Sequence, residues 1–120
     1  METFNHKFRT RTKRLVVDII KFYVDLRKTD EIRIIGKQLM RSATSVAANF
    51  RAATRGRSDK EFYAKLCIVI EEADETLFWL ELLLETELVK TDQITNLTSE
   101  ITELLSVFAR TRKTINDKKK

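Results

Sequence analysis

The sequence predicts an all-α protein, folded as a single up-down-up-down antiparallel four-helix bundle. Its 120 residues include no proline and only two glycines, whereas all-β folds need many more turn-forming residues. Apolar residues recur every three to four positions in four separate stretches, which is the period of an amphipathic helix. The connections between the stretches are short, so consecutive helices should be antiparallel neighbours. We expect one domain over residues 1–120, with helices at about 9–28, 31–55, 59–87 and 92–115 and a frayed basic tail at 116–120.

The first two helices are predicted by their apolar stripes and by the break between them. Thr29 and Asp30 supply this break and the cap of the second helix. Gly36 and the alanines of the second helix are small, which lets a neighbouring backbone approach closely. The stripe of the first helix is Phe8, Leu15, Ile19, Phe22 and Leu26, and that of the second is Ile32, Ile35, Leu39, Ala43, Val46 and Phe50.

The junction between the second and third helices carries clear stop and start signals. The second helix ends at Arg55–Arg57, and Ser58 with Glu61 forms the capping box S-x-x-E of the third. Thr91 or Asp92 is expected to cap the fourth helix. The inner stripe of the third helix is Phe62, Leu66, Val69, Ala73, Leu77, Leu80 and Leu84, and that of the fourth is Ile94, Leu97, Ile101, Leu104 and Phe108.

The third helix carries more apolar surface than one bundle face requires. A helix that is apolar on two sides is usually buried on two sides, and in a chain of this size another subunit is the simplest cover. We therefore expect a homo-oligomer, although a wide central face in a monomer is the alternative. The residues expected at the interface between subunits are Tyr63, Ile70, Phe78, Trp79 and Leu82.

The charge is sorted by position in the bundle. Residues 1–14, 51–65 and 107–120, which meet at one end, hold sixteen Lys/Arg against four Asp/Glu, a net of +12. The remaining residues hold seven against fourteen, a net of −7, so the overall +5 hides a strong polarity. Such a cluster is typical of proteins that bind phosphate backbones, and the N-terminal dipole of the third helix adds to it. The expected nucleic-acid-binding residues are Arg9, Arg11, Lys13, Arg14, Arg51, Arg55, Arg57, Lys60, Arg110, Arg112 and Lys113.

A simpler explanation of these cations is that they complement helix dipoles or aid solubility. Basic residues at helix C-termini fit that explanation. The first helix does not, because its N-terminus favours acidic residues and carries five basic ones.

No catalytic, metal or cofactor site is recognisable, so we expect a non-enzymatic protein without a cofactor. A di-iron bundle needs two Glu-x-x-His motifs, and His6 is the single histidine. The lone Cys67 rules out an internal disulfide and a cysteine-based zinc site. Asp18 and Lys21 interrupt the apolar run that follows the basic start, and no cleavage site or long apolar segment is present. We expect a soluble cytoplasmic protein with no membrane partner.

A structural polar network is predicted between the second and third helices. Antiparallel pairing sets Arg41 level with Glu72, and pairing with the first helix brings Asp18 close to Arg41 as well. A partly buried Arg41–Glu72 ion pair, with Ser42 or Ser45 satisfying the remaining lone pairs, would determine the register of the helices. A catalytic carboxylate cluster is a weaker reading, because no metal ligand or base accompanies it. The network comprises Asp18, Arg41, Ser45, Asn49 and Glu72.

Residues 39–84 resemble the four helix bundle protein family. That family includes proteins encoded in 23S rRNA intervening sequences of bacteria and the accessory variability determinants of diversity-generating retroelements. Its pattern is roughly R-x-x-x-S-[IV]-x-A-N, followed by a basic turn and S-x-x-[ED]-F. The segment 71–83 is also similar to one branch. The matching positions are Arg41, Ser45, Val46, Ala48, Asn49, Ser58, Glu61 and Phe62.

The resemblance implies a homopentameric ring with a basic rim. It also implies that the protein binds nucleic acid and assists a reverse transcriptase, as the accessory determinants do. Many members have proline where Ala47 stands and Ala-Glu-Gly where this chain has residues 51–53. The leading hypothesis is a non-enzymatic oligomeric accessory protein that binds RNA or DNA backbones. The alternative is an oligomeric protein–protein interaction scaffold with no nucleic-acid role.

Overall fold

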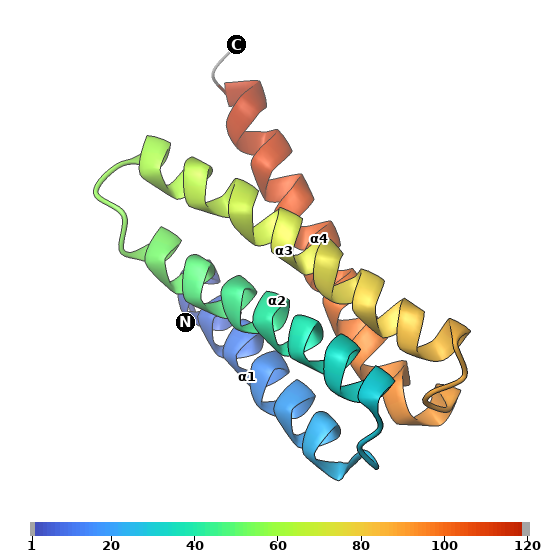
Figure 1. Ribbon diagram of the computed structural model, residues 1–120. Helices are drawn as coiled ribbons and strands as arrows, with labels where there is room; N and C mark the ends of the chain where they lie inside the picture. The colour runs from blue at the N-terminus through green and yellow to red at the C-terminus, as the bar shows by residue number, and fades with distance from the viewer. Residues whose placement is uncertain (1, 119–120) are drawn as a thin grey trace.

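The computed structural model describes residues 2–118, which form four helices and no strand (Figure 1). The helices are α1 (Phe4–Asp25), α2 (Asp30–Thr54), α3 (Asp59–Glu85) and α4 (Thr91–Lys118). The bundle is elongated, with extents of 48 × 25 × 23 Å. Consecutive helices run antiparallel, α2 and α3 make the most extensive contact, and α1 meets α4 over a smaller area. The predicted all-α class and four-helix arrangement are confirmed.

One continuous apolar core runs through the four helices. The predicted inner stripes supply most of it, because side chains three and four positions apart share a helix face. The largest fully buried side chains are Phe50, Phe108, Leu15, Ile19, Leu39, Leu66, Leu80, Leu83, Ile94, Ile101, Leu104 and Val46.

Helix α1 begins and ends earlier than the expected 9–28. The Thr3 hydroxyl accepts a hydrogen bond from the His6 amide at 3.1 Å, and this N-cap starts the helix at Phe4. At the other end Leu26 is extended, and the Lys28 ammonium donates to the carbonyls of Tyr23 and Leu26 at 2.6 and 2.5 Å. A lysine placed on the last carbonyls satisfies groups that the ended helix leaves unpaired.

The junction between α2 and α3 is close to the prediction. The Ser58 hydroxyl accepts from the Glu61 amide at 3.1 Å, as in a capping box. The Glu61 carboxylate, however, accepts from the Arg57 amide at 2.6 Å, one residue before the cap. A Cβ atom at Gly56 would lie 3.1 Å from the Ala53 carbonyl oxygen and 3.2 Å from Glu61 Cβ, so a side chain at this position would fit only if these neighbours moved by a few tenths of an ångström.

The turn between α3 and α4 differs from the expected cap. Glu87 has a φ of 59°, and the amides of Glu87 and Leu88 donate to the carbonyls of Leu84 and Leu83. This is a Schellman ending with a non-glycine residue at the left-handed position. The expectation that Thr91 or Asp92 caps α4 was wrong, since the helix already includes both and Gln93 accepts from the Lys90 amide at 2.8 Å.

The end of α4 was also placed too early. Residues 116–118, expected to be frayed, continue the helix, whereas residues 119–120 of the predicted tail lie outside the described part of the chain.

Gly36 allows α1 and α2 to meet closely, as the small residues of α2 predicted. It is buried, and a Cβ atom there would overlap the ring of Tyr23. The Tyr23 ring is also covered by the Lys28 ammonium, 4.5 Å from its centroid. The glycine therefore makes room for an aromatic side chain beside the α1–α2 turn.

We expect Gly36→Ala to destabilise the protein by about 1 kcal/mol, measured by urea unfolding. Alanine ordinarily gains up to about 1 kcal/mol over glycine inside a helix, but the overlap with Tyr23 costs about 1–3 kcal/mol. In a Tyr23→Ala background the same substitution should become stabilising, because the ring is gone. A gain of stability with Tyr23 in place would show that the ring does not occupy this space.

Candidate functional site

Four phenylalanines bring the predicted basic segments together at one end of the bundle. Phe50 from α2 stacks on Phe108 from α4 with ring centroids 5.0 Å apart, and Phe8 from α1 meets the edge of Phe108 at 5.6 Å. Phe4 contacts Phe8 at 4.7 Å and Phe50 at 6.3 Å. The start of α1, the end of α2 and the distal part of α4 are thus held around one apolar cluster.

A groove between α1 and α2 collects cations from two of these segments. Its volume is about 510 Å³, and none of the residues that line it is acidic. Small or short side chains such as Ala47 and Thr44 leave the space between the helices open. The Arg9 guanidinium on one wall donates to the Thr54 hydroxyl at 3.4 Å. The lining residues are His6, Arg9, Thr10, Lys13, Val16, Thr44, Ala47, Ala48, Arg51 and Arg55.

The remaining predicted cations do not line this groove. Arg110 lines a second hollow of about 430 Å³, beside Phe4 and Phe62 at the end of α4. The exposed residues near the α2–α3 turn and on the last turns of α4 line neither hollow. They are Arg57, Lys60 and Lys113, together with the half-buried Arg112.

Arg11 was predicted to bind nucleic acid but joins α1 to α4. Its guanidinium donates to Glu100 at 2.5 Å and pairs with Glu103 at 3.3 Å. The hydrogen bond to Glu100 is the main cause that raises the pKa of Arg11 above its ordinary value. Two carboxylates cancel the charge that a phosphate would need, so we remove Arg11 from the candidate set. Arg14 is exposed but pairs with Asp18 at 3.2 Å.

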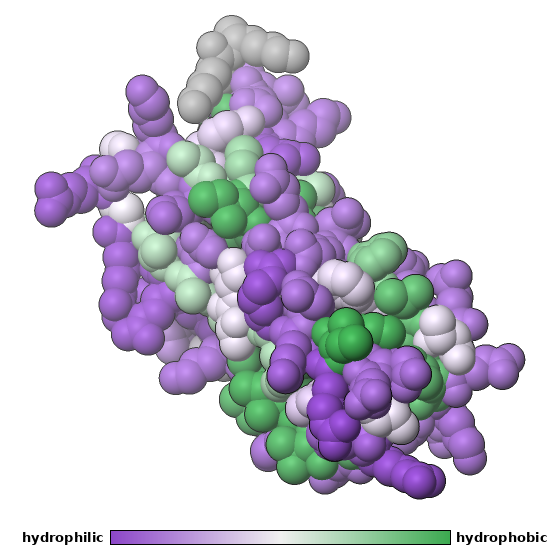
Figure 2. Space-filling view, in the orientation of Figure 1, coloured by the Kyte–Doolittle hydropathy of each residue, from purple (hydrophilic) through white to green (hydrophobic). Residues whose placement is uncertain are grey.

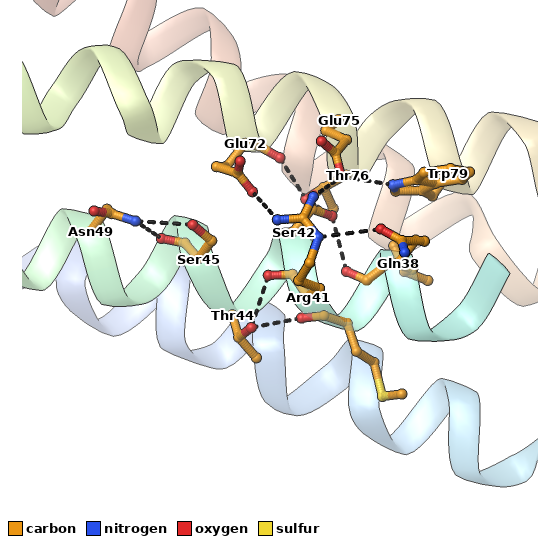
Figure 3. Close-up of polar contacts among 12 residues, drawn as sticks. Gln38, Arg41, Ser42, Thr44, Ser45, Asn49, Glu72, Glu75, Thr76 and Trp79 are labelled. Carbon is orange, nitrogen blue, oxygen red and sulfur yellow. Dashed lines mark hydrogen bonds and ion pairs between the residues drawn. The ribbon is translucent and has the colours of Figure 1, made fainter. Parts of the chain in front are cut away.

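The predicted ion pair between α2 and α3 is present, with one additional partner (Figure 3). The Arg41 guanidinium pairs with Glu72 at 3.2 Å and also with Glu75, which the sequence reasoning missed. The Glu75 carboxylate additionally accepts from the Trp79 indole at 3.0 Å. Half of the Arg41 side chain is exposed, so the pair contributes little stability and instead favours one register of the helices.

The other members of the predicted network have different partners. Asp18 pairs with Arg14 and not with Arg41, because Asp18 lies on the side of α1 that faces α4, whereas Arg41 points to α3. Ser45 does not reach Glu72, and its hydroxyl accepts from the Asn49 amide at 2.9 Å. Ser42 is fully buried, and its oxygen lies 2.9 Å from the equally buried Thr76 hydroxyl (Figure 3).

The second apolar face of α3 is less open than predicted. Ile70 and Trp79 pack partly against the core, and Tyr63 and Leu82 are half-buried, whereas Phe78 is 51% exposed. Apolar surface is visible over α3 and over the C-terminal half of α1 in Figure 2. The most exposed large apolar side chains, which the sequence reasoning did not single out, are Val24 (66%) and Ile34 (68%), accompanied by Val17 and Ile20.

Two features of residues 2–118 bear on other classes of protein. No group of three or more His, Cys, Asp or Glu side chains lies close enough to hold a metal ion. None of the four helices has an apolar stretch long enough to span a bilayer.

The fold and its basic end define a small helical-bundle protein with one cationic end. The chain belongs to the 23S rRNA-intervening sequence protein family, which it matches over residues 5–110. It is similar to a crystal structure of a protein of unknown function from the S23 ribosomal protein family of Bacteroides thetaiotaomicron, with 32% sequence identity and a TM-score of 0.80. The similarity covers 88% of this chain and 97% of that one. No curated protein matches the chain.

The Trp79–Glu75 hydrogen bond should make stability depend on pH. With Arg41, it lowers the pKa of Glu75 below the ordinary 4.5. The unfolded chain therefore takes up this proton at a higher pH than the folded protein, so the contribution is complete above pH 4.5 and is lost as the pH falls through the folded pKa.

Trp79→Phe removes the donor and keeps an aromatic ring. We expect a loss of under about 1 kcal/mol at neutral pH, because a third of Glu75 is exposed, and a smaller loss below pH 4.5. Urea unfolding at several pH values measures both losses. The control is Trp79→Phe in a Glu75→Gln background, where the loss of unfolding free energy caused by Trp79→Phe should not depend on pH. A loss that is constant with pH would assign the effect to packing.

Proposed function

We propose that this protein is a non-enzymatic accessory protein that binds the phosphate backbone of RNA or DNA through its basic end. The observation that carries this proposal is the aromatic cluster, which gathers cations from separate segments around a groove with no acidic lining. Lys and Arg side chains that neutralise phosphates release condensed counterions, and this release supplies most of the affinity in sequence-independent binding.

The contacts should position the nucleic acid without reading its sequence. Sequence is read by side chains that reach base edges from an element seated in a groove. The cations here lie on the packed helices α1, α2 and α4 and around the α2–α3 turn, so they are spread over one end of the bundle and are not gathered on one element that could enter a groove. The most favourable candidates are Arg51, Arg55 and Arg57, followed by Arg9, Lys13 and Arg14.

The family supports finer proposals. Its description refers to a 23S rRNA intervening sequence, which is consistent with a bacterial, cytoplasmic protein near RNA. From the resemblance to retroelement accessory determinants, we also propose that the protein forms a homopentamer and has a reverse transcriptase as a partner. A reverse transcriptase gene beside the gene for this chain, or a location inside an rRNA gene, would distinguish these roles.

Arg55→Ala/Arg57→Ala should weaken binding to a labelled oligonucleotide, measured by fluorescence anisotropy at several salt concentrations. If both arginines contact phosphates, the slope of log K against log salt should become shallower by about 1.4–1.8. For the wild type, about six phosphate contacts would lower the affinity about 1,000-fold between 50 and 200 mM salt.

The matched control is Arg33→Ala/Lys37→Ala, which removes two exposed cations from the other half of α2. It should leave the affinity nearly unchanged. Equal losses in the two double variants would mean that net charge alone drives binding. A flat salt response of the wild type would exclude phosphate binding.

A scaffold for protein partners is the second candidate, favoured by the exposed Phe78, Val24 and Ile34. Both candidates expect an oligomer, and the pentamer has five times the 14.1 kDa of one chain. Light scattering should give this mass, and Phe78→Ser should lower it if α3 forms the interface. A monomeric mass would remove the ring from the proposal. A pull-down that retains a protein and no RNA would favour the scaffold.

A further inference from the structure

The groove between α1 and α2 has an apolar lining in addition to its cations. Val16 and Ala47 are half-buried, and Ala48 is exposed beside them. Arg51 and Arg55 on the same groove are exposed. Val16 and Ala47 are therefore less exposed than these two arginines, and a ligand that fills the groove meets apolar side chains flanked by positive charge.

The apolar lining distinguishes between forms of nucleic acid. A duplex stacks its base faces inside and presents phosphates and groove edges to a protein, so it gains little from buried aliphatic side chains. A single strand leaves base faces and sugars exposed, and these can be buried against apolar surface while the phosphates stay at the rim. Only a single strand can contact both the apolar lining and the cations of the groove.

We propose that the α1–α2 groove is a binding site for single-stranded nucleic acid. This inference rests on the proposed function, and it specifies the form of the ligand and the part of the basic end that holds it. Arg9 and Lys13 stand one turn apart on α1, and the same spacing separates Arg51 in the last turn of α2 from Arg55 at its C-cap. A strand that runs along the groove has a cation on one wall or the other for successive phosphates.

The lining also determines the expected selectivity. His6 is the one aromatic ring among the ten residues that line the groove, and none of them is Phe, Tyr or Trp, so bases are held mainly by aliphatic contact and less by the aromatic stacking that most single-strand-binding proteins use. Aliphatic contact is indifferent to base identity and to the sugar 2′-hydroxyl. RNA and DNA single strands should therefore bind with similar affinity.

Ala48→Phe tests the site because it fills the groove and leaves every charge in place. Ala52→Phe is the matched control, since Ala52 is exposed on the same helix one turn further along and does not line the groove. Labelled oligouridylate, oligothymidylate and a duplex, each of about 12 nucleotides per strand, are titrated with the wild type and both variants. Circular dichroism confirms that each variant is folded.

The wild type should bind both single strands at least about tenfold more tightly than the duplex, and Ala48→Phe should remove at least about tenfold of that affinity, which corresponds to about 50–60 Å² of buried apolar surface. Ala52→Phe should bind as the wild type does. If Ala48→Phe is unfolded, the smaller Ala48→Leu replaces it with the same expectation.

Failure of this inference is distinguishable from failure of the proposed function. Unchanged single-strand binding by the folded Ala48→Phe variant, or equal affinity for duplex and single strands, would overturn the inference that the groove binds single strands. The Arg55→Ala/Arg57→Ala variant would still test whether the basic end binds phosphates. No binding of any of the three probes by the wild type would overturn both. A preference for one sugar by more than about tenfold would contradict the aliphatic mode of contact.

Discussion

The stacking of Phe50 on Phe108 is the contact on which the basic end depends. Segments that carry a net +12 would repel one another if nothing held them together. Burial of a phenylalanine side chain contributes about 1.5–3 kcal/mol, whereas a pair of exposed charges contributes less than about 1 kcal/mol and is screened by salt. The cluster of Phe4, Phe8, Phe50 and Phe108 therefore outweighs the repulsion, and Arg11 reduces it further by pairing with α4.

Register between α2 and α3 is determined by polar contacts away from this cluster. The buried Ser42 and Thr76 hydroxyls lie 2.9 Å apart across the two helices, and each is also within hydrogen-bond distance of a carbonyl of its own helix, so their contact adds a preference for the observed alignment. Arg41 spans the same two helices at the surface. The contact between α2 and α3 is the most extensive of the bundle, so this alignment also determines where the α2–α3 turn and its arginines lie.

The fold could be predicted because each helix is specified by residues near one another in the sequence. The caps at Thr29 and Ser58 depend on a hydroxyl three positions from its donor, and both were found. The missed features depend on geometry that spacing does not encode. Arg11 meets Glu100 from 89 positions away, and the groove exists because small residues of α2, such as Thr44 and Ala47, face α1. Gln93 accepts from the Lys90 amide three positions earlier, which is the spacing of a capping box. The sequence favoured Thr91 and Asp92 instead, because hydroxyl and acid side chains are the commoner caps.

The sorting of charge along a bundle 48 Å long makes the molecule an electric dipole. In the field of a polyanion, such a body rotates before contact, so that its positive end arrives first. Orientation in advance shortens the search for a productive encounter, which affects the association rate more than the lifetime of the complex. It also affects how copies of the chain meet one another. Side-by-side copies that point the same way place like ends together, so a parallel ring needs apolar contacts strong enough to overcome that repulsion or an anion seated at its positive rim.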